Sequence, residues 1–87
     1  MMLSTKIVEM TPSQCRAARA LLDMTQSDLA ARADAGLSTV VDFEKSRRQV
    51  PAETIAKLRK ALEAAGVELV PEDSKGAGVR FVAPSTP

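Results

Sequence analysis

Apolar residues recur at helical spacing along most of the chain, and residues that cap helices separate these segments. Thr11 can cap the first predicted helix, and Pro12 suits its first helical position. Gln14 follows three residues after Thr11, which completes a capping box. The apolar stripe of this segment is Cys15, Ala18 and Leu22, with Leu21 beside it. We therefore expect a helix that begins at Thr11.

A second, shorter helix is predicted from the same kind of signal. Thr25 can cap it, and Asp28 stands three residues later, where a carboxylate suits the positive end of the helix dipole. The residues expected to face inward are Leu29, Ala30 and Ala33. Ala30 is small enough to allow a close crossing with a neighbouring helix, so another short helix can pack against this one.

A tight turn is predicted after the second helix, because the pattern breaks at residues 34–36 and then resumes. Asp34 tolerates a left-handed backbone better than most residues, and Gly36 can cap the next helix. The third helix is expected over residues 37–45, with Val40 and Phe43 directed inward.

A fourth helix is predicted after a basic loop at residues 46–50, which Pro51 ends. It is expected to run over residues 52–65, and Gly66 is well placed to end it. Its apolar residues at helical spacing are Ile55, Leu58 and Leu62.

The pattern changes after the fourth helix and predicts a β-hairpin. Residues 67–70 and 79–82 are short β-prone runs, separated by a polar loop with two glycines. The expected fold is mainly α: four helices followed by a C-terminal hairpin. The expected segments are an N-terminal arm or short strand at 1–10, a helical domain at 11–66, the hairpin at 67–82 and a disordered tail at 83–87.

The composition argues against several classes of function. The 87-residue chain has no His and one Cys, so it lacks the usual general base and a plausible set of metal ligands. A glycine-rich phosphate loop is missing as well, and we expect no enzymatic activity, no cofactor and no metal site. Phe43 and Phe81 are the only aromatic residues, which is too few for a platform that stacks single-stranded bases. Cys15 is expected to be a small buried core residue rather than a redox switch.

The length of the chain predicts one domain with a thin core, because a chain this short buries only about 60% of its unfolded surface. Dimerisation is a common way to cover the apolar surface that remains. The sequence contains no recognisable signal peptide or membrane span, and we expect a cytoplasmic protein without membrane contact.

Charge is unevenly distributed, although the formal net charge is only +1. Positive residues gather between residues 45 and 60, where Glu53 is the only acidic residue; they are Lys45, Arg47, Arg48, Lys57, Arg59 and Lys60. A solvated helix face and a surface for nucleic acid are both compatible with this run of charge.

The segment TQSDLAARADAGLSTVVDFEKSRR, residues 25–48, resembles the Cro and lambda-repressor type of helix-turn-helix, also called the xenobiotic-response-element family. The resemblance covers residues 11–65. Family members usually have Gly at the positions of Asp34 and Ser46, a larger aliphatic residue at the position of Ala35, and a fifth helix in place of the hairpin. The matching residues are Thr25, Gln26, Leu29, Ala30, Ala33, Val40, Phe43 and Glu44.

The resemblance implies that the third helix enters the major groove of DNA. Its implied base contacts are Leu37, Ser38, Thr39, Val41 and Asp42. Leu37 and Val41 would meet thymine methyl groups, or alternatively a partner protein, and Asp42 would accept from a cytosine amino group. None of the five is Arg, Lys, Gln or Asn, so we expect modest direct readout supplemented by DNA shape.

Further roles follow from the same resemblance. Arg19 and Glu44 would form a structural ion pair that orients the third helix. The implied phosphate contacts are Gln26, Lys45, Arg47 and Arg48. From the hairpin we expect a dimer interface formed by Val67, Leu69, Val79 and Phe81.

These features favour a sequence-specific transcriptional regulator that binds double-stranded DNA. We expect a repressor that acts as a homodimer on a palindromic operator. The alternative is an antitoxin or another protein-interaction module, which binds a toxin or other protein partner and for which DNA binding is secondary.

Overall fold

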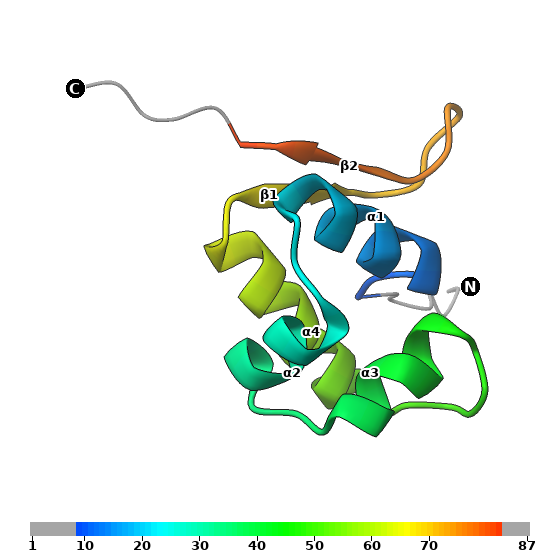
Figure 1. The fold of residues 1–87 in the computed structure, drawn as a ribbon. Coiled ribbons are helices and arrows are strands. Elements are labelled where there is room, and N and C mark those ends of the chain that lie inside the picture. Colours follow the sequence, from blue (N-terminus) through cyan, green and yellow to red (C-terminus); the bar gives the residue numbers. More distant parts are fainter. Residues whose placement is uncertain (1–8, 83–87) are drawn as a thin grey trace.

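The computed structural model describes residues 9–82, and Figure 1 shows their arrangement. The four helices pack together, and the hairpin runs along one side of them, against α1 and α4. The predicted fold class, mainly α with a C-terminal hairpin, is therefore confirmed. The elements are α1 (Pro12–Leu22), α2 (Gln26–Ala33), α3 (Leu37–Glu44), α4 (Ala52–Ala64), β1 (Val67–Val70) and β2 (Gly78–Phe81).

The first two helices begin where their capping residues stand. The Gln14 backbone N–H donates to Thr11 Oγ1 at 3.1 Å, and the Gln14 side chain accepts from the Thr11 backbone N–H at 3.0 Å. Thr25 and Asp28 make the same reciprocal pair at 2.9 and 3.2 Å. Both capping boxes satisfy N–H groups that a helix otherwise leaves without partners, so these helix starts are set by local sequence.

The short turns after α2 and α3 both use a left-handed residue. Asp34 ends α2 with φ 54° and ψ 50°, and the Ala35 N–H then donates to the Ala30 carbonyl at 2.9 Å. Ser46 follows α3 with φ 54°. These are two positions at which the resemblance leads one to expect Gly, and the backbone explains why, since only Gly adopts this conformation without steric cost.

The hairpin belongs to the core of the chain. Val67 and Leu69 are only 1% and 3% exposed and pack in the same cluster as the inner faces of the helices. Gln14 also joins α1 to the hairpin, because its amide nitrogen donates to the carbonyl of Val70 at 2.9 Å and to that of Gly78 at 3.0 Å. The fully buried side chains at the centre of the core include Leu29, Val40, Leu58 and Leu62.

The two strands pair antiparallel with Val67 opposite Phe81 and Leu69 opposite Val79. Gly66, with φ 117°, turns the chain from α4 into β1. Strand β2 begins one residue earlier than predicted, at Gly78. Of the predicted N-terminal arm, residues 1–8 lie outside the described part, as does the predicted tail at 83–87; within the described part, Met10 is buried in the core.

Candidate nucleic-acid interface

Helices α2 and α3 form a pair of eight-residue helices joined by a short turn. Val40 and Phe43 are buried on the inner side of α3, as their spacing predicts. Leu37 and Ser38 are exposed, and Leu37 retains 47% of its surface accessible. Val41 is half-buried, as are Thr39 and Asp42. The residues expected to contact bases therefore share the outer side of this helix.

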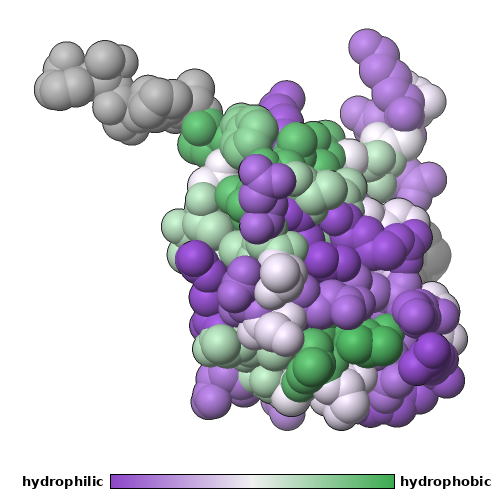
Figure 2. Space-filling model, in the orientation of Figure 1, coloured by the Kyte–Doolittle hydropathy of each residue, from purple (hydrophilic) through white to green (hydrophobic). Residues whose placement is uncertain are grey.

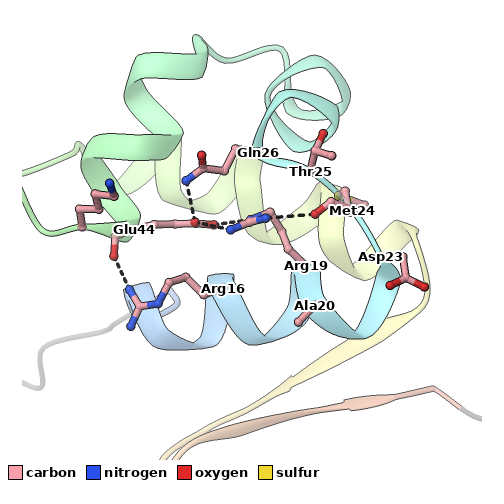
Figure 3. A pocket seen from close by; sticks show the side chains of 9 residues that line it. Arg16, Arg19, Ala20, Asp23, Met24, Thr25, Gln26 and Glu44 are labelled. Atoms are coloured by element: carbon pink, nitrogen blue, oxygen red, sulfur yellow. Dashed lines mark hydrogen bonds and ion pairs between the residues drawn. The ribbon is translucent and has the colours of Figure 1, made fainter.

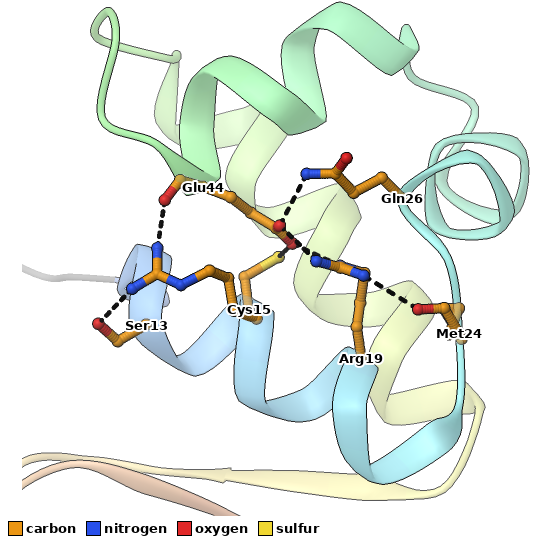
Figure 4. Close-up of polar contacts among 7 residues, drawn as sticks. Ser13, Cys15, Arg19, Met24, Gln26 and Glu44 are labelled. Carbon is orange, nitrogen blue, oxygen red and sulfur yellow. Dashed lines mark hydrogen bonds and ion pairs between the residues drawn. The ribbon is translucent and has the colours of Figure 1, made fainter.

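Glu44 lies at the centre of a polar cluster between α1, the start of α2 and the end of α3, as Figure 4 shows. Arg19 donates from Nε to Glu44 Oε2 and from Nη2 to Oε1, both at 2.7 Å. Gln26 Nε2 donates to Glu44 Oε1 at 3.0 Å, and Cys15 Sγ to Oε2 at 3.1 Å. Arg16 donates to the Glu44 main-chain carbonyl. The cluster therefore joins the C-terminal end of α3 to both α1 and α2.

The cluster also sets the protonation states of its members. Burial by itself raises the pKa of Glu44, but hydrogen bonds from Arg19, Cys15 and Gln26 outweigh it and hold that pKa below its ordinary value. The hydrogen bond to Glu44 raises the pKa of Arg19. Burial, reinforced by the Glu44 carboxylate, raises the pKa of the Cys15 thiol well above its usual range. Glu44 is thus an anion and Cys15 a neutral donor at pH 7.

An open cleft lies beside the cluster, between α1 and the start of α2 (Figure 3). Arg16, Arg19 and Lys45 contribute positive charge to its lining, and Thr25 and Gln26 mark the N-terminal end of α2. Arg16 was missed in the sequence analysis, although it stands three residues before Arg19 and so shares its side of the helix. Asp23 and Glu44 also line the cleft, and Glu44 pairs with Arg19, so the basic groups left for an anion are Arg16 and Lys45, beside the positive end of the α2 dipole.

The residues expected to contact phosphate do not all lie in equivalent surroundings. Lys45 and Arg47 are exposed. The side-chain amide of Gln26 is hydrogen-bonded to Glu44. Arg48 lies back over α3, where its Nε donates to Asp42 Oδ2 at 2.9 Å and its Nη2 to Thr39 Oγ1 at 3.2 Å. The expected base contacts Thr39 and Asp42 are thus joined to an expected phosphate contact.

The four side chains expected at a dimer interface differ in exposure. Val67 and Leu69 are buried, because the inner face of the short hairpin covers the core of its own chain. Val79 is half-buried and packs against the same core. Phe81 is 59% exposed, and the adjacent Val82 is also exposed. Figure 2 shows apolar side chains gathered beside the hairpin at the upper end of the molecule.

The comparison with known families agrees with this geometry. A helix-turn-helix family model of the Cro/C1 type matches residues 16–69, which is more than half of the chain. The protein belongs to this family and is a DNA-binding transcriptional regulator. A search of curated proteins finds no match. None of the helices within residues 9–82 has the length and apolar character needed to cross a membrane.

Proposed function

We propose that the protein is a transcriptional repressor that binds a palindromic operator as a homodimer, with α3 as its recognition helix. The observation that carries the proposal is the attachment of α3. Its inner side is buried in the core and Glu44 is clamped by Arg19, while its outer side is left accessible. A recognition helix needs this combination, because base contacts require a fixed orientation and a free face.

Phosphate contacts on both sides of α3 are part of the proposal. On one side, the first backbone N–H groups of α2 and the cleft beside Arg16 would receive one phosphate. On the other side, Lys45 and Arg47 extend into solvent from the end of α3 and the loop that follows. Such contacts hold the protein in register on the duplex and make its affinity depend on salt.

Selection of bound sequences from random duplex DNA, followed by binding across a salt series, tests the proposal. We expect the selected sequences to share a two-fold-related motif. Arg47→Ala should weaken binding to all sequences alike and reduce the log–log salt slope by about 0.9, the value for one phosphate contact. Lys75→Ala, in the hairpin loop away from α3, is the control and should leave the slope unchanged. Failure to enrich any duplex sequence would contradict the proposal.

A protein-interaction module remains the second candidate, and the exposed apolar side chains favour it. Leu37 on α3 and Phe81 on β2 are both large and accessible, and either could anchor a toxin or another protein at its own site. In that case a purified partner protein should bind as tightly to Arg47→Ala as to the unmodified chain. Leu37→Ser, in contrast, should weaken that binding while the protein remains folded.

A further inference from the structure

Within residues 9–82, Arg48 is the long, multiply donating side chain that hydrogen-bonds to the outer residues of α3. It comes from the loop after the helix and reaches back along it, to Asp42 six residues earlier and Thr39 nine residues earlier. The outer residues of α3 itself include no Arg, Lys, Gln or Asn. The fold therefore adds to this surface a chemical group that the helix sequence lacks.

The two contacts of Arg48 leave the outer end of its guanidinium group, formed by Nη1 and Nη2, free to donate. A guanidinium group carries five N–H donors in one plane. Within residues 9–82, Nε–H is used by Asp42 and one Nη2–H by Thr39, so both N–H groups of Nη1 and the second of Nη2 remain. These three include the pair at the end of the group, one on each terminal nitrogen. Two parallel N–H groups can bind two neighbouring acceptors at once, and guanine presents such acceptors, O6 and N7, in the major groove.

The contacts also hold the guanidinium in one orientation. Asp42 and Thr39 are half-buried on α3 and bind two adjacent nitrogens along one side of the group, which restricts its rotation. Less entropy is then lost when its free edge binds a base. A flexible arginine at the same place would have to be ordered first.

The charge balance distinguishes Arg48 from its neighbours. The Asp42 carboxylate lies 2.9 Å from Arg48 Nε, so the pair carries little net charge toward a phosphate and its carboxylate repels one. Arg47 has no carboxylate partner within residues 9–82 and keeps its full charge for the backbone. The paired arginine is therefore better suited to the neutral, hydrogen-bonding edge of a base.

We propose that Arg48 is a specificity-determining residue that donates both terminal N–H groups to O6 and N7 of a guanine in the major groove, with Asp42 as its positioning residue. This inference rests on the proposed binding of duplex DNA through α3. It adds a direct reading of one base to a surface otherwise suited to apolar and hydroxyl contacts. A single bidentate contact of this kind discriminates by about 1–3 kcal/mol, or roughly 5- to 150-fold in affinity.

The test uses the full chain and the operator obtained by selection. Each guanine in a half-site is replaced in turn by 7-deazaguanine, which keeps O6 and the Watson–Crick pairing but lacks the N7 acceptor. We expect one replacement to weaken binding of the unmodified protein by at least 5-fold. In Arg48→Met and Asp42→Ala the same replacement should have an effect of less than 2-fold, because the first variant removes the donors and the second removes the carboxylate that orients them. Arg47→Met, from the same loop, is the matched control and should keep the full effect.

The possible results separate the inference from the function on which it rests. If Arg48→Met weakens binding to all sequences alike while the penalty for 7-deazaguanine persists, Arg48 is a phosphate contact and the inference is wrong. An operator without an essential guanine overturns it as well. If the unmodified protein itself binds no duplex better than a neutral control protein, the proposed function fails first. Thermal unfolding of each variant, expected to match that of the unmodified chain, excludes loss of the fold as the cause.

Discussion

At the scale of single residues, Glu44 concentrates most of the polar interactions between helices. It is 1% exposed, and a buried carboxylate is costly unless charged and hydrogen-bonding partners surround it. Both oxygens of Glu44 are occupied, by Arg19 and by the donors from α1 and α2. The desolvation cost offsets much of the attraction between the charges, so the main effect of the pair is to fix the position of α3 rather than to raise stability.

Removing one partner of the Arg19–Glu44 pair and removing both should change the free energy of unfolding by different amounts. Arg19→Ala leaves the Glu44 charge buried without its cation and should lower the free energy of unfolding by about 3 kcal/mol. The double variant Arg19→Met with Glu44→Met removes both charges and should recover most of that loss. Urea unfolding measures both values. A double variant that is no more stable than Arg19→Ala would contradict the interpretation.

The lowered pKa of Glu44 predicts a loss of stability in acid. Because its folded-state pKa lies below the unfolded value of about 4.3, its contribution is complete above that value and declines as the pH falls through the folded-state pKa. Glu44→Gln should therefore be less stable at pH 7 and lose less stability between pH 5 and pH 2.5. Stability is measured by urea unfolding at each pH.

At the scale of elements, the ends of the short helices store a small amount of strain. Ser46 has φ 54°, a conformation that costs an L-residue other than Gly, Asn or Asp about 1–2 kcal/mol. Asp34 has the same φ, but its short polar side chain tolerates it better. The loop that carries Arg47 and Arg48 therefore begins at an unfavourable residue.

Replacing Ser46 by Gly should relieve that strain. We expect Ser46→Gly to raise the free energy of unfolding by about 0.5–1 kcal/mol after the greater freedom of Gly in the unfolded chain is subtracted. For a domain of this size the gain corresponds to a few degrees in Tm, which calorimetry resolves. Ser38→Gly, inside α3, is the matched control and should lower Tm, because there the backbone is helical. A fall in Tm for both variants would show that Ser46 is unstrained.

The elements could be predicted from the sequence wherever their signals are local. Each capping box involves residues three apart, and the apolar spacing of Val40 and Phe43 determines which side of α3 is buried. The left-handed backbone at Asp34 was likewise foreseen from its side chain.

Other features depend on contacts between distant segments and could not be predicted in this way. The alternation in a four-residue strand indicates that one face is covered, but not whether Val67 meets its own core or a partner. The path of the loop after α3 decides that Arg48 lies on Asp42, and no local pattern encodes that path. The role of Gln26 as a donor to Glu44 also depends on packing between helices.

At the scale of the whole molecule, the hairpin has a buried part that belongs to the core and an exposed end. Its inner face completes the core, and Gln14 fastens it to α1 through two backbone carbonyls. Phe81 lies opposite Val67 and so projects to the same face, but it is 59% exposed, and the adjacent Val82 is 54% exposed. Within residues 9–82 the sheet has only two strands, so the outer edge of β2 has no partner strand. Deleting the hairpin would therefore remove the core contacts together with any interface.

A substitution at the exposed end of the hairpin separates its contribution to the core from the proposed interface. We expect Phe81→Glu to remain folded, since Phe81 is 59% exposed, but to convert the proposed dimer to a monomer in sedimentation experiments at micromolar concentration, with a fall in Tm no larger than the stabilisation that dimerisation adds. Leu37→Glu introduces the same charge at another exposed apolar site, on α3, and should remain a dimer. A dimer presents two recognition helices about 34 Å apart, so Phe81→Glu should also lose the preference for a palindrome over a single half-site. If the unmodified chain sediments as a monomer while still selecting a palindrome, two copies meet only on the DNA and the hairpin is not the interface.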